Sequence, residues 1–278
     1  MRLILVLSLA AVCAFGQKKT VLMITDAEGV GGVCRQDQTD PKDPEMRQLL
    51  TGEINAAVEG LLAGGADEVV VWDGHDGSQT LSTLTIHPKA KLLMGSVGAS
   101  MMMERGWSAV AYVGQHSKAN VKGGIMAHSF SSLGIQKMTL NGKTVGEIDM
   151  IAAMAGQFGI PAVFLSGDKA AAEELREIVP QAELAVVKEG LARYTCISLS
   201  AQSARDLIRE RARKSVALIG KVKPYRLEGP VTLEIESTTR NTLGPDAELR
   251  PGSEIVDSQT IRFRGKDVLE VWQRYRAR

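Results

Sequence analysis

Two short apolar runs separated by one helical segment limit most strongly how this chain can fold. Residues 19–25 (KTVLMIT) and 68–72 (EVVVW) are almost uninterrupted apolar runs, which is typical of strands buried on both faces of a sheet. Between them, Asp43 and Pro44 open a helix as N-cap and first helical residue, and residues 64–65 (Gly-Gly) end it. Two buried strands joined by a helix predict a parallel sheet with a right-handed crossover.

The remaining pattern continues this arrangement to about residue 181 and then changes. Before that point we expect strands at 91–94, 109–113 and 162–165, a hairpin at 136–145 around Asn141-Gly142, and helices at 146–158 and 168–179. After it come a basic amphipathic helix at 201–218, strand signals at 231–236 and 253–263, and a helix at 266–275. We therefore predict a three-layer α/β/α domain with a mostly parallel sheet over residues 17–181, and a smaller α+β domain over 182–278.

Composition argues against nucleic-acid binding. The chain of 278 residues has 33 Lys and Arg against 32 Asp and Glu, and only 4% aromatic residues. It therefore lacks the basic surplus and the stacking side chains that nucleic-acid partners require, and we expect no nucleic-acid partner.

The first 16 residues have the layout of a secretory signal peptide. Arg2 is followed by an apolar run at 3–12 and by small residues that permit cleavage after Gly16. The run is shorter than the ~20 residues that span a bilayer. Two alternatives are a buried first element and lipid attachment at Cys13, although Val12 is larger than lipidation sites normally take. We expect an exported protein, periplasmic or extracellular, that is not an integral membrane protein after processing.

Cleavage would leave two cysteines in the mature chain. These are Cys34 and Cys196. Outside the cytoplasm two cysteines can pair, but two buried free thiols are equally compatible with the sequence. Their spacing resembles neither a disulfide framework nor a thiolate zinc site.

Carboxylate and imidazole side chains follow three of the expected strands directly. Asp26 and Glu28 follow the first strand, His75 the second, and His116 the strand at 109–113. Ligands of open α/β sheets collect beyond these carboxyl ends. Oxygen and imidazole ligands without thiolates suit zinc, manganese or cobalt. With Glu147 after the hairpin, five ligands exceed what one catalytic zinc takes, which predicts two ions ~3.5–4 Å apart that share a carboxylate.

Each of these residues also has a simpler role that the spacing leaves open. Asp26 could cap the turn after its strand, and Glu28 could be a solvated loop carboxylate. Glu147 could be an acid in the first turn of a helix, where the helix dipole favours it. A single histidine such as His75 or His116 is more often a hydrogen-bonded structural residue than a ligand. The sequence contains neither H-E-x-x-H nor G-x-S-x-G.

The order and spacing of these segments resemble the zinc-dependent D-aminopeptidases of the dipeptide-transport operon (DppA-type). The likeness covers nearly all of the mature chain. The matching segments are residues 26–32 (DAEGVGG), 71–75 (VWDGH), 113–116 (VGQH), 126–129 (MAHS) and 145–147 (VGE).

The resemblance implies a dinuclear zinc site with assigned roles. Asp26 would bridge both ions, with Glu28 and His75 completing one site and His116 and Glu147 the other. His128 would act in catalysis. The resemblance also implies a homo-oligomeric ring and, in several members, a preference for D-amino acids at the peptide N-terminus.

The leading interpretation is an exported metal-dependent aminopeptidase that removes N-terminal residues, of D- or L-configuration, from short peptides. One alternative is an exported metal- or peptide-binding protein without catalysis. Another is a dinuclear phosphoesterase, although those enzymes usually begin with Asp-x-His where this chain has Asp26-x-Glu28. The sequence leaves open the stereospecificity, the natural substrate, the metal used in the cell and the size of the ring.

Overall fold

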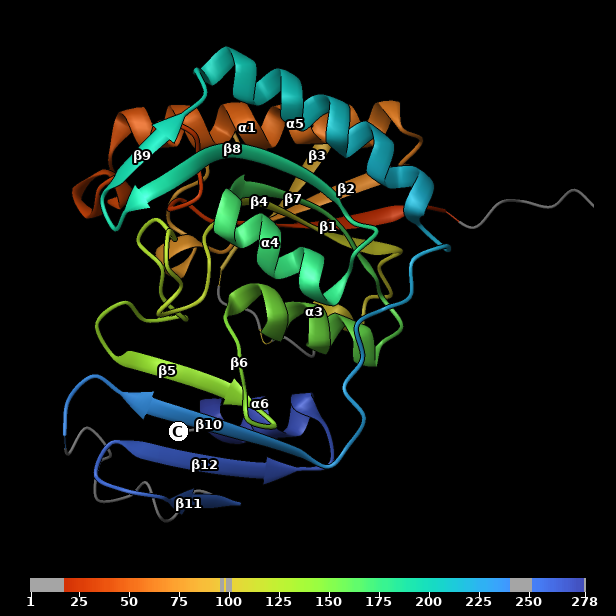
Figure 1. Ribbon diagram of the computed structural model, residues 1–278. Coiled ribbons are helices and arrows are strands. Elements are labelled where there is room, and N and C mark those ends of the chain that lie inside the picture. The colour runs from red at the N-terminus through yellow and green to blue at the C-terminus, as the bar shows by residue number, and fades with distance from the viewer. Residues whose placement is uncertain (1–17, 96–97, 99–101, 241–251, 278) are drawn as a thin grey trace, which may run out of the picture.

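The computed structural model describes residues 18–95, 98, 102–240 and 252–277 (Figure 1). The predicted signal peptide at residues 1–16 lies outside the described residues. No helix within the described ranges is long and apolar enough to cross a membrane.

A sheet of seven strands forms the centre of the molecule. Its strands are β1 (Thr20–Thr25), β2 (Glu68–Asp73), β3 (Ala90–Leu93), β4 (Ala109–Gln115), β7 (Ala162–Asp168), β8 (Glu183–Ala192) and β9 (Thr195–Ser198). They are ordered β3-β2-β1-β4-β7-β8-β9, and all neighbours are parallel except β8 and β9. Strand β4 is buried throughout, and β1 is buried from its second residue onward, as continuous apolar runs predict.

Helices cover both faces of this sheet (Figure 1). Helices α1 (Pro44–Ala63) and α5 (Ala201–Ser215) lie on one face, and α3 (Glu147–Gln157) and α4 (Lys169–Ile178) on the other. The Asp43 side chain accepts a hydrogen bond from the Met46 amide at 2.7 Å, which caps α1 as the sequence predicts. Helix α5 packs closely on α1 because Gly60 has no side chain. A Cβ atom there would lie 2.3 Å from the Arg209 carbonyl oxygen.

A second, antiparallel sheet lies beyond α3 (Figure 1). Its strand order is β11-β12-β10-β5-β6, and α6 packs against β10, β12 and α3. One cluster of buried side chains runs continuously from Tyr112 in the first sheet through Met150 to Phe263 in the second. The elements are β5 (Ile135–Leu140), β6 (Lys143–Thr144), β10 (Val231–Ser237), β11 (Ser253–Ile255), β12 (Thr260–Gly265) and α6 (Val268–Arg276).

The predicted fold class is confirmed, but the two sheets do not separate at residue 181. Strands β5 and β6 precede that residue and belong to the second sheet, because β5 pairs antiparallel with β10. Strands β8 and β9 follow it and extend the first sheet, because β8 pairs parallel with β7. The chain therefore crosses between the sheets on both sides of the predicted boundary.

The loop after β1 is held by two buried charged side chains. Lys188 on β8 donates from Nζ to the carbonyl oxygens of Glu28 (2.5 Å), Val30 (2.9 Å) and Val33. Glu53 on α1 accepts a hydrogen bond from the Gly31 amide at 2.8 Å. Burial raises the pKa of the Glu53 carboxyl to about 7, although the Gly31 amide and Lys188 oppose the rise.

This raised pKa predicts how the stability of the protein depends on pH. Because the folded protein binds the Glu53 proton more tightly than the unfolded chain, the resulting stabilisation is complete below pH 4.5 and is lost as the pH rises through about 7. Glu53→Gln stays neutral and keeps an acceptor for the Gly31 amide. Between pH 5 and pH 8 the wild type should therefore lose ~2.5 kcal/mol of unfolding free energy relative to the variant.

Urea unfolding of both proteins at the two pH values measures this difference. Parallel pH profiles for the wild type and Glu53→Gln would show that Glu53 does not change its protonation state on folding.

Candidate metal centre

The strand order brings the predicted site residues to one edge of the first sheet. Asp26 and Glu28 follow β1, His75 follows β2 and His116 follows β4. Because β1 lies between β2 and β4, the carboxyl ends of these strands are neighbours. Glu147, the first residue of α3, reaches the same edge beside His116.

His75 presents one ring nitrogen to the carboxylates and the other to a carbonyl group. Its Nδ1 lies 3.0 Å from Asp26 Oδ1 and 3.3 Å from Glu28 Oε2. Its Nε2 lies 2.7 Å from the Thr39 carbonyl oxygen. A carbonyl oxygen only accepts hydrogen bonds, so in the neutral ring Nε2 carries the hydrogen and Nδ1 offers its lone pair to the cluster.

His116 is oriented in the same way with its nitrogens exchanged. Its Nδ1 lies 2.9 Å from the Ser117 carbonyl oxygen, which fixes the hydrogen there. Its Nε2 lies 3.3 Å from Asp26 Oδ2 and 3.5 Å from Glu147 Oε1. The two oxygens of Asp26 therefore face two different histidines.

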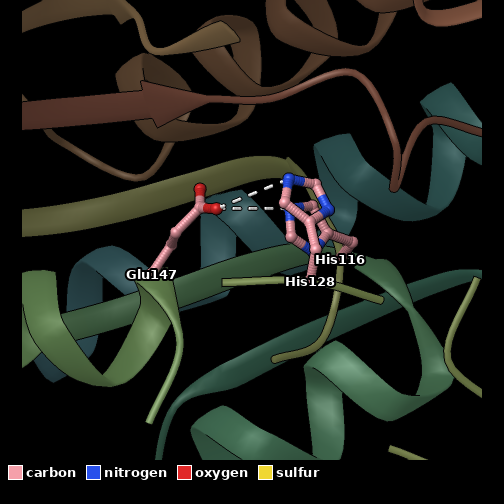
Figure 2. Close-up of side chains that lie close together, drawn as sticks. All are labelled: His116, His128 and Glu147. Carbon is pink, nitrogen blue, oxygen red and sulfur yellow. Dashed lines mark ion pairs between the residues drawn. The ribbon is translucent and has the colours of Figure 1, made fainter. Parts of the chain in front are cut away.

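His128 lies against the His116 ring (Figure 2). The rings stack with centroids 4.0 Å apart and an angle of 15° between their planes. His128 Nδ1 lies 2.9 Å from the Met126 carbonyl oxygen, and Nε2 lies 3.9 Å from Glu147 Oε1. Left-handed backbone at Met126 (φ 49°) and Phe130 (φ 60°) bends the loop so that the half-buried His128 reaches the cluster.

The cluster strongly favours positive charge. Burial lowers the pKa of His75, but the neighbouring carboxylates of Asp26 and Glu28 outweigh it and raise this pKa to about 11. Burial also opposes protonation of His116, yet Glu147 and Asp26 hold its pKa well above the usual value. Burial followed by the neighbouring Glu28 charge raises the pKa of Asp26. These shifts indicate a negative potential that divalent cations would satisfy.

The donor atoms fit a divalent cation. Glu28 Oε2 and His116 Nε2 are buried, have no hydrogen-bond partner, and face the cluster. Two sets of three ligand atoms each lie within 4.8 Å of one another, one from Asp26, Glu28 and His116 and the other from His116, His128 and Glu147. Carboxylate oxygens and imidazoles suit zinc, manganese or cobalt. His128 would therefore lie within reach of an ion held by His116 and Glu147.

A buried network that the sequence did not reveal connects the two sides of the site. The Lys118 amide donates to Glu174 Oε2 at 2.9 Å, and Lys118 Nζ lies 3.5 Å from Asp149 Oδ2. The same Asp149 oxygen accepts a hydrogen bond from the Gly146 amide at 3.0 Å. The network thus ties the turn after His116 to the start of α3.

The cluster opens into an acidic cleft of about 610 Å³. Asp40 and Asp76 are exposed residues of its lining, as is Asp37, which pairs with Arg35. No sequence signal distinguishes these acids from ordinary solvated loop residues. Phe130 lines the cleft on the side of the His128 loop.

Cys34 and Cys196 do not belong to the predicted ligand set. Cys34 and Cys196 are half-buried free thiols. Burial and then the neighbouring Cys34 raise the pKa of Cys196 to about 11, so this thiol stays protonated near neutral pH.

An α/β sheet whose strand ends gather buried carboxylates and imidazoles beside an acidic cleft is the arrangement expected of a metal-dependent enzyme. Residues 20–277 match the peptidase M55 family, which is described as D-aminopeptidase. A curated D-aminopeptidase of Bacillus subtilis (strain 168) is 30% identical over 258 residues, which cover 90% of this chain and 93% of the relative.

A solved structure agrees with these matches. It is that of the Zn-dependent D-aminopeptidase DppA from Bacillus subtilis, described as a self-compartmentalizing protease. The TM-score is 0.84 at 29% identity, over 92% of this chain and 95% of that chain. The chain belongs to the peptidase M55 family of D-aminopeptidases, which makes it a metallopeptidase and confirms the resemblance drawn from its motifs.

Proposed function

We propose that the chain is a zinc-dependent D-aminopeptidase that removes N-terminal residues from short peptides, with two zinc ions per chain. The observation that carries the proposal is the position of Asp26, whose two oxygens lie 3.0 Å from His75 and 3.3 Å from His116. A carboxylate between two imidazoles on opposite sides is suited to bridge two ions. The similar solved enzyme is Zn-dependent by its description.

The remaining ligands would divide between the two ions. Glu28 lies beside His75 at 3.3 Å, which supports one site. Glu147 lies beside His116 at 3.5 Å, which supports the other. Manganese or cobalt would suit the same donors.

The cleft and His128 supply the other parts of the mechanism. When bound, zinc polarises a substrate carbonyl and lowers the pKa of a water molecule. Asp40 and Asp76 offer negative charge to the ammonium group of a peptide N-terminus. The hydrogen bond from His128 Nδ1 to the Met126 carbonyl leaves Nε2 free to accept a proton and to pass it to the leaving amine.

Chromogenic substrates test this function directly. Zinc-loaded protein should hydrolyse D-Ala p-nitroanilide faster than L-Ala p-nitroanilide and should leave p-nitrophenyl phosphate intact. A chelator should abolish the activity and added zinc should restore it. Faster hydrolysis of the phosphate would favour the phosphoesterase, and a zinc-loaded protein that turns over none of the three would favour a binding protein.

Substitution of His128 distinguishes a role in catalysis from a role in binding the metal. We expect His128→Ala to keep its zinc and its fold while kcat falls ~10²–10⁴-fold, the usual contribution of general acid–base catalysis. His75→Ala and His116→Ala are the matched controls and should lose zinc first. Zinc content and kcat are measured on the same samples. Normal turnover in His128→Ala, or loss of zinc from it, would refute the assigned role.

We also propose that the mature protein is exported and forms a homo-oligomeric ring. The apolar run at residues 3–12 supports export. Exposed apolar side chains on β8, on β9 and in the segments beside them, together with the self-compartmentalizing relative, support assembly. These side chains are Leu191, Tyr194, Ile197 and Leu199. Native mass spectrometry of protein from its host should find an N-terminus near Gln17 and a multiple of the single-chain mass. An intact Met1 form or a monomer would contradict export or assembly respectively.

A further inference from the structure

A second cavity adjoins the acidic cleft at His128. It has a volume of about 210 Å³ and shares His128 and Ser132 with the cleft. The two cavities differ in charge. Asp40 and Asp76 line the cleft, whereas Arg193 is the one Asp, Glu, Lys or Arg among the described residues that line the smaller cavity.

Arg193 is an exposed residue at the wall of this cavity. It lies in the turn between β8 and β9, and its carbonyl oxygen accepts a hydrogen bond from the Met126 amide at 3.0 Å. Its guanidinium donates from Nη1 to the Ala127 carbonyl at 3.5 Å and from Nε to the Tyr194 hydroxyl at 3.1 Å. None of the described carboxylates forms an ion pair with it. The exposed guanidinium therefore lies beside the His128 loop without a carboxylate partner among the described residues.

The wall itself depends on close contact between two backbone segments. A Cβ atom at Gly190 would lie 2.1 Å from the Gly123 carbonyl oxygen, so β8 and the loop before His128 can meet only because residue 190 is a glycine. This contact keeps the Arg193 turn beside the loop that carries the proposed catalytic histidine.

We propose that the smaller cavity binds the C-terminal carboxylate of a short peptide substrate and that Arg193 is the residue that pairs with it. The inference rests on the proposed aminopeptidase function. In that reaction His128 faces the leaving amine, and the leaving amine belongs to the residue that follows the cleaved bond. A substrate whose ammonium group lies among the acids of the cleft therefore extends past His128 toward Arg193.

Opposite charges at the two ends of the site select substrates by their length. An arginine–carboxylate pair is charge-assisted and can be bidentate. Because the cavity is small, it favours a substrate that ends soon after the cleaved bond. Dipeptides with a free carboxylate are the substrates that satisfy both ends.

The test compares D-Ala-Gly with its C-terminal amide, using zinc-loaded enzyme. Wild-type kcat/KM should be at least about tenfold higher for the free acid, since a hydrogen bond to a charged group contributes ~1.5–3 kcal/mol. Arg193→Gln should remove this preference by raising KM for the acid much more than KM for the amide. Arg193→Lys, which keeps the charge, should retain part of the preference. Lys122→Gln is the matched control, because Lys122 is exposed in the same loop and does not line the cavity.

Each other outcome overturns the inference in a recognisable way. Equal cleavage of acid and amide by the wild type would exclude a carboxylate site and leave the aminopeptidase function standing. Equal loss of both activities in Arg193→Gln and Arg193→Lys would assign Arg193 a structural role. The same loss of preference in Lys122→Gln would show that the preference arises from general surface charge and not from Arg193. A zinc-loaded wild type that cleaves neither peptide would refute the proposed function and the inference together.

Discussion

The contact of Asp26 with two histidines is the interaction on which the rest of the site depends. A single carboxylate can face His75 and His116 at once only if its strand lies between theirs, and the order β2-β1-β4 provides this. The parallel sheet sends all three strand ends to one edge, where open α/β sheets bind their ligands. The strand order of the sheet therefore determines which side chains meet at the site.

Holding the loop after β1 in place requires residues from distant parts of the chain. Lys188 donates to three of its carbonyl groups, and Glu53 accepts from one of its amides. The approach of β4 is equally close, because a Cβ atom at Gly114 would lie 2.0 Å from the Asp26 carbonyl oxygen. These buried hydrogen bonds restrain the loop, which keeps the two oxygens of Asp26 directed at their partners.

The sequence predicted the parts of the site that follow from local rules. Asp26, Glu28, His75 and His116 were found because each directly follows an apolar strand. The position of His128 against His116 depends on left-handed backbone at Met126 that no spacing rule reveals.

The parts that sequence analysis missed depend on contacts between distant segments. Strands β8 and β9 carry exposed residues that weaken the apolar signal, so they were not predicted. The pairing of β5 with β10 joins segments that are far apart in the chain, which is why the sheets interleave across residue 181. Asp40 and Asp76 look like ordinary surface acids until the fold brings them to one cleft.

Zinc content per chain, measured on wild type, Asp26→Ala and Asp37→Ala purified in parallel, tests the central claim most directly. The bridging role predicts close to two ions in the wild type and in Asp37→Ala, whose side chain lines the cleft without joining the cluster. It predicts loss of both ions in a folded Asp26→Ala protein. One ion in the wild type, or an Asp26→Ala protein that keeps both, would contradict a carboxylate shared between two metals.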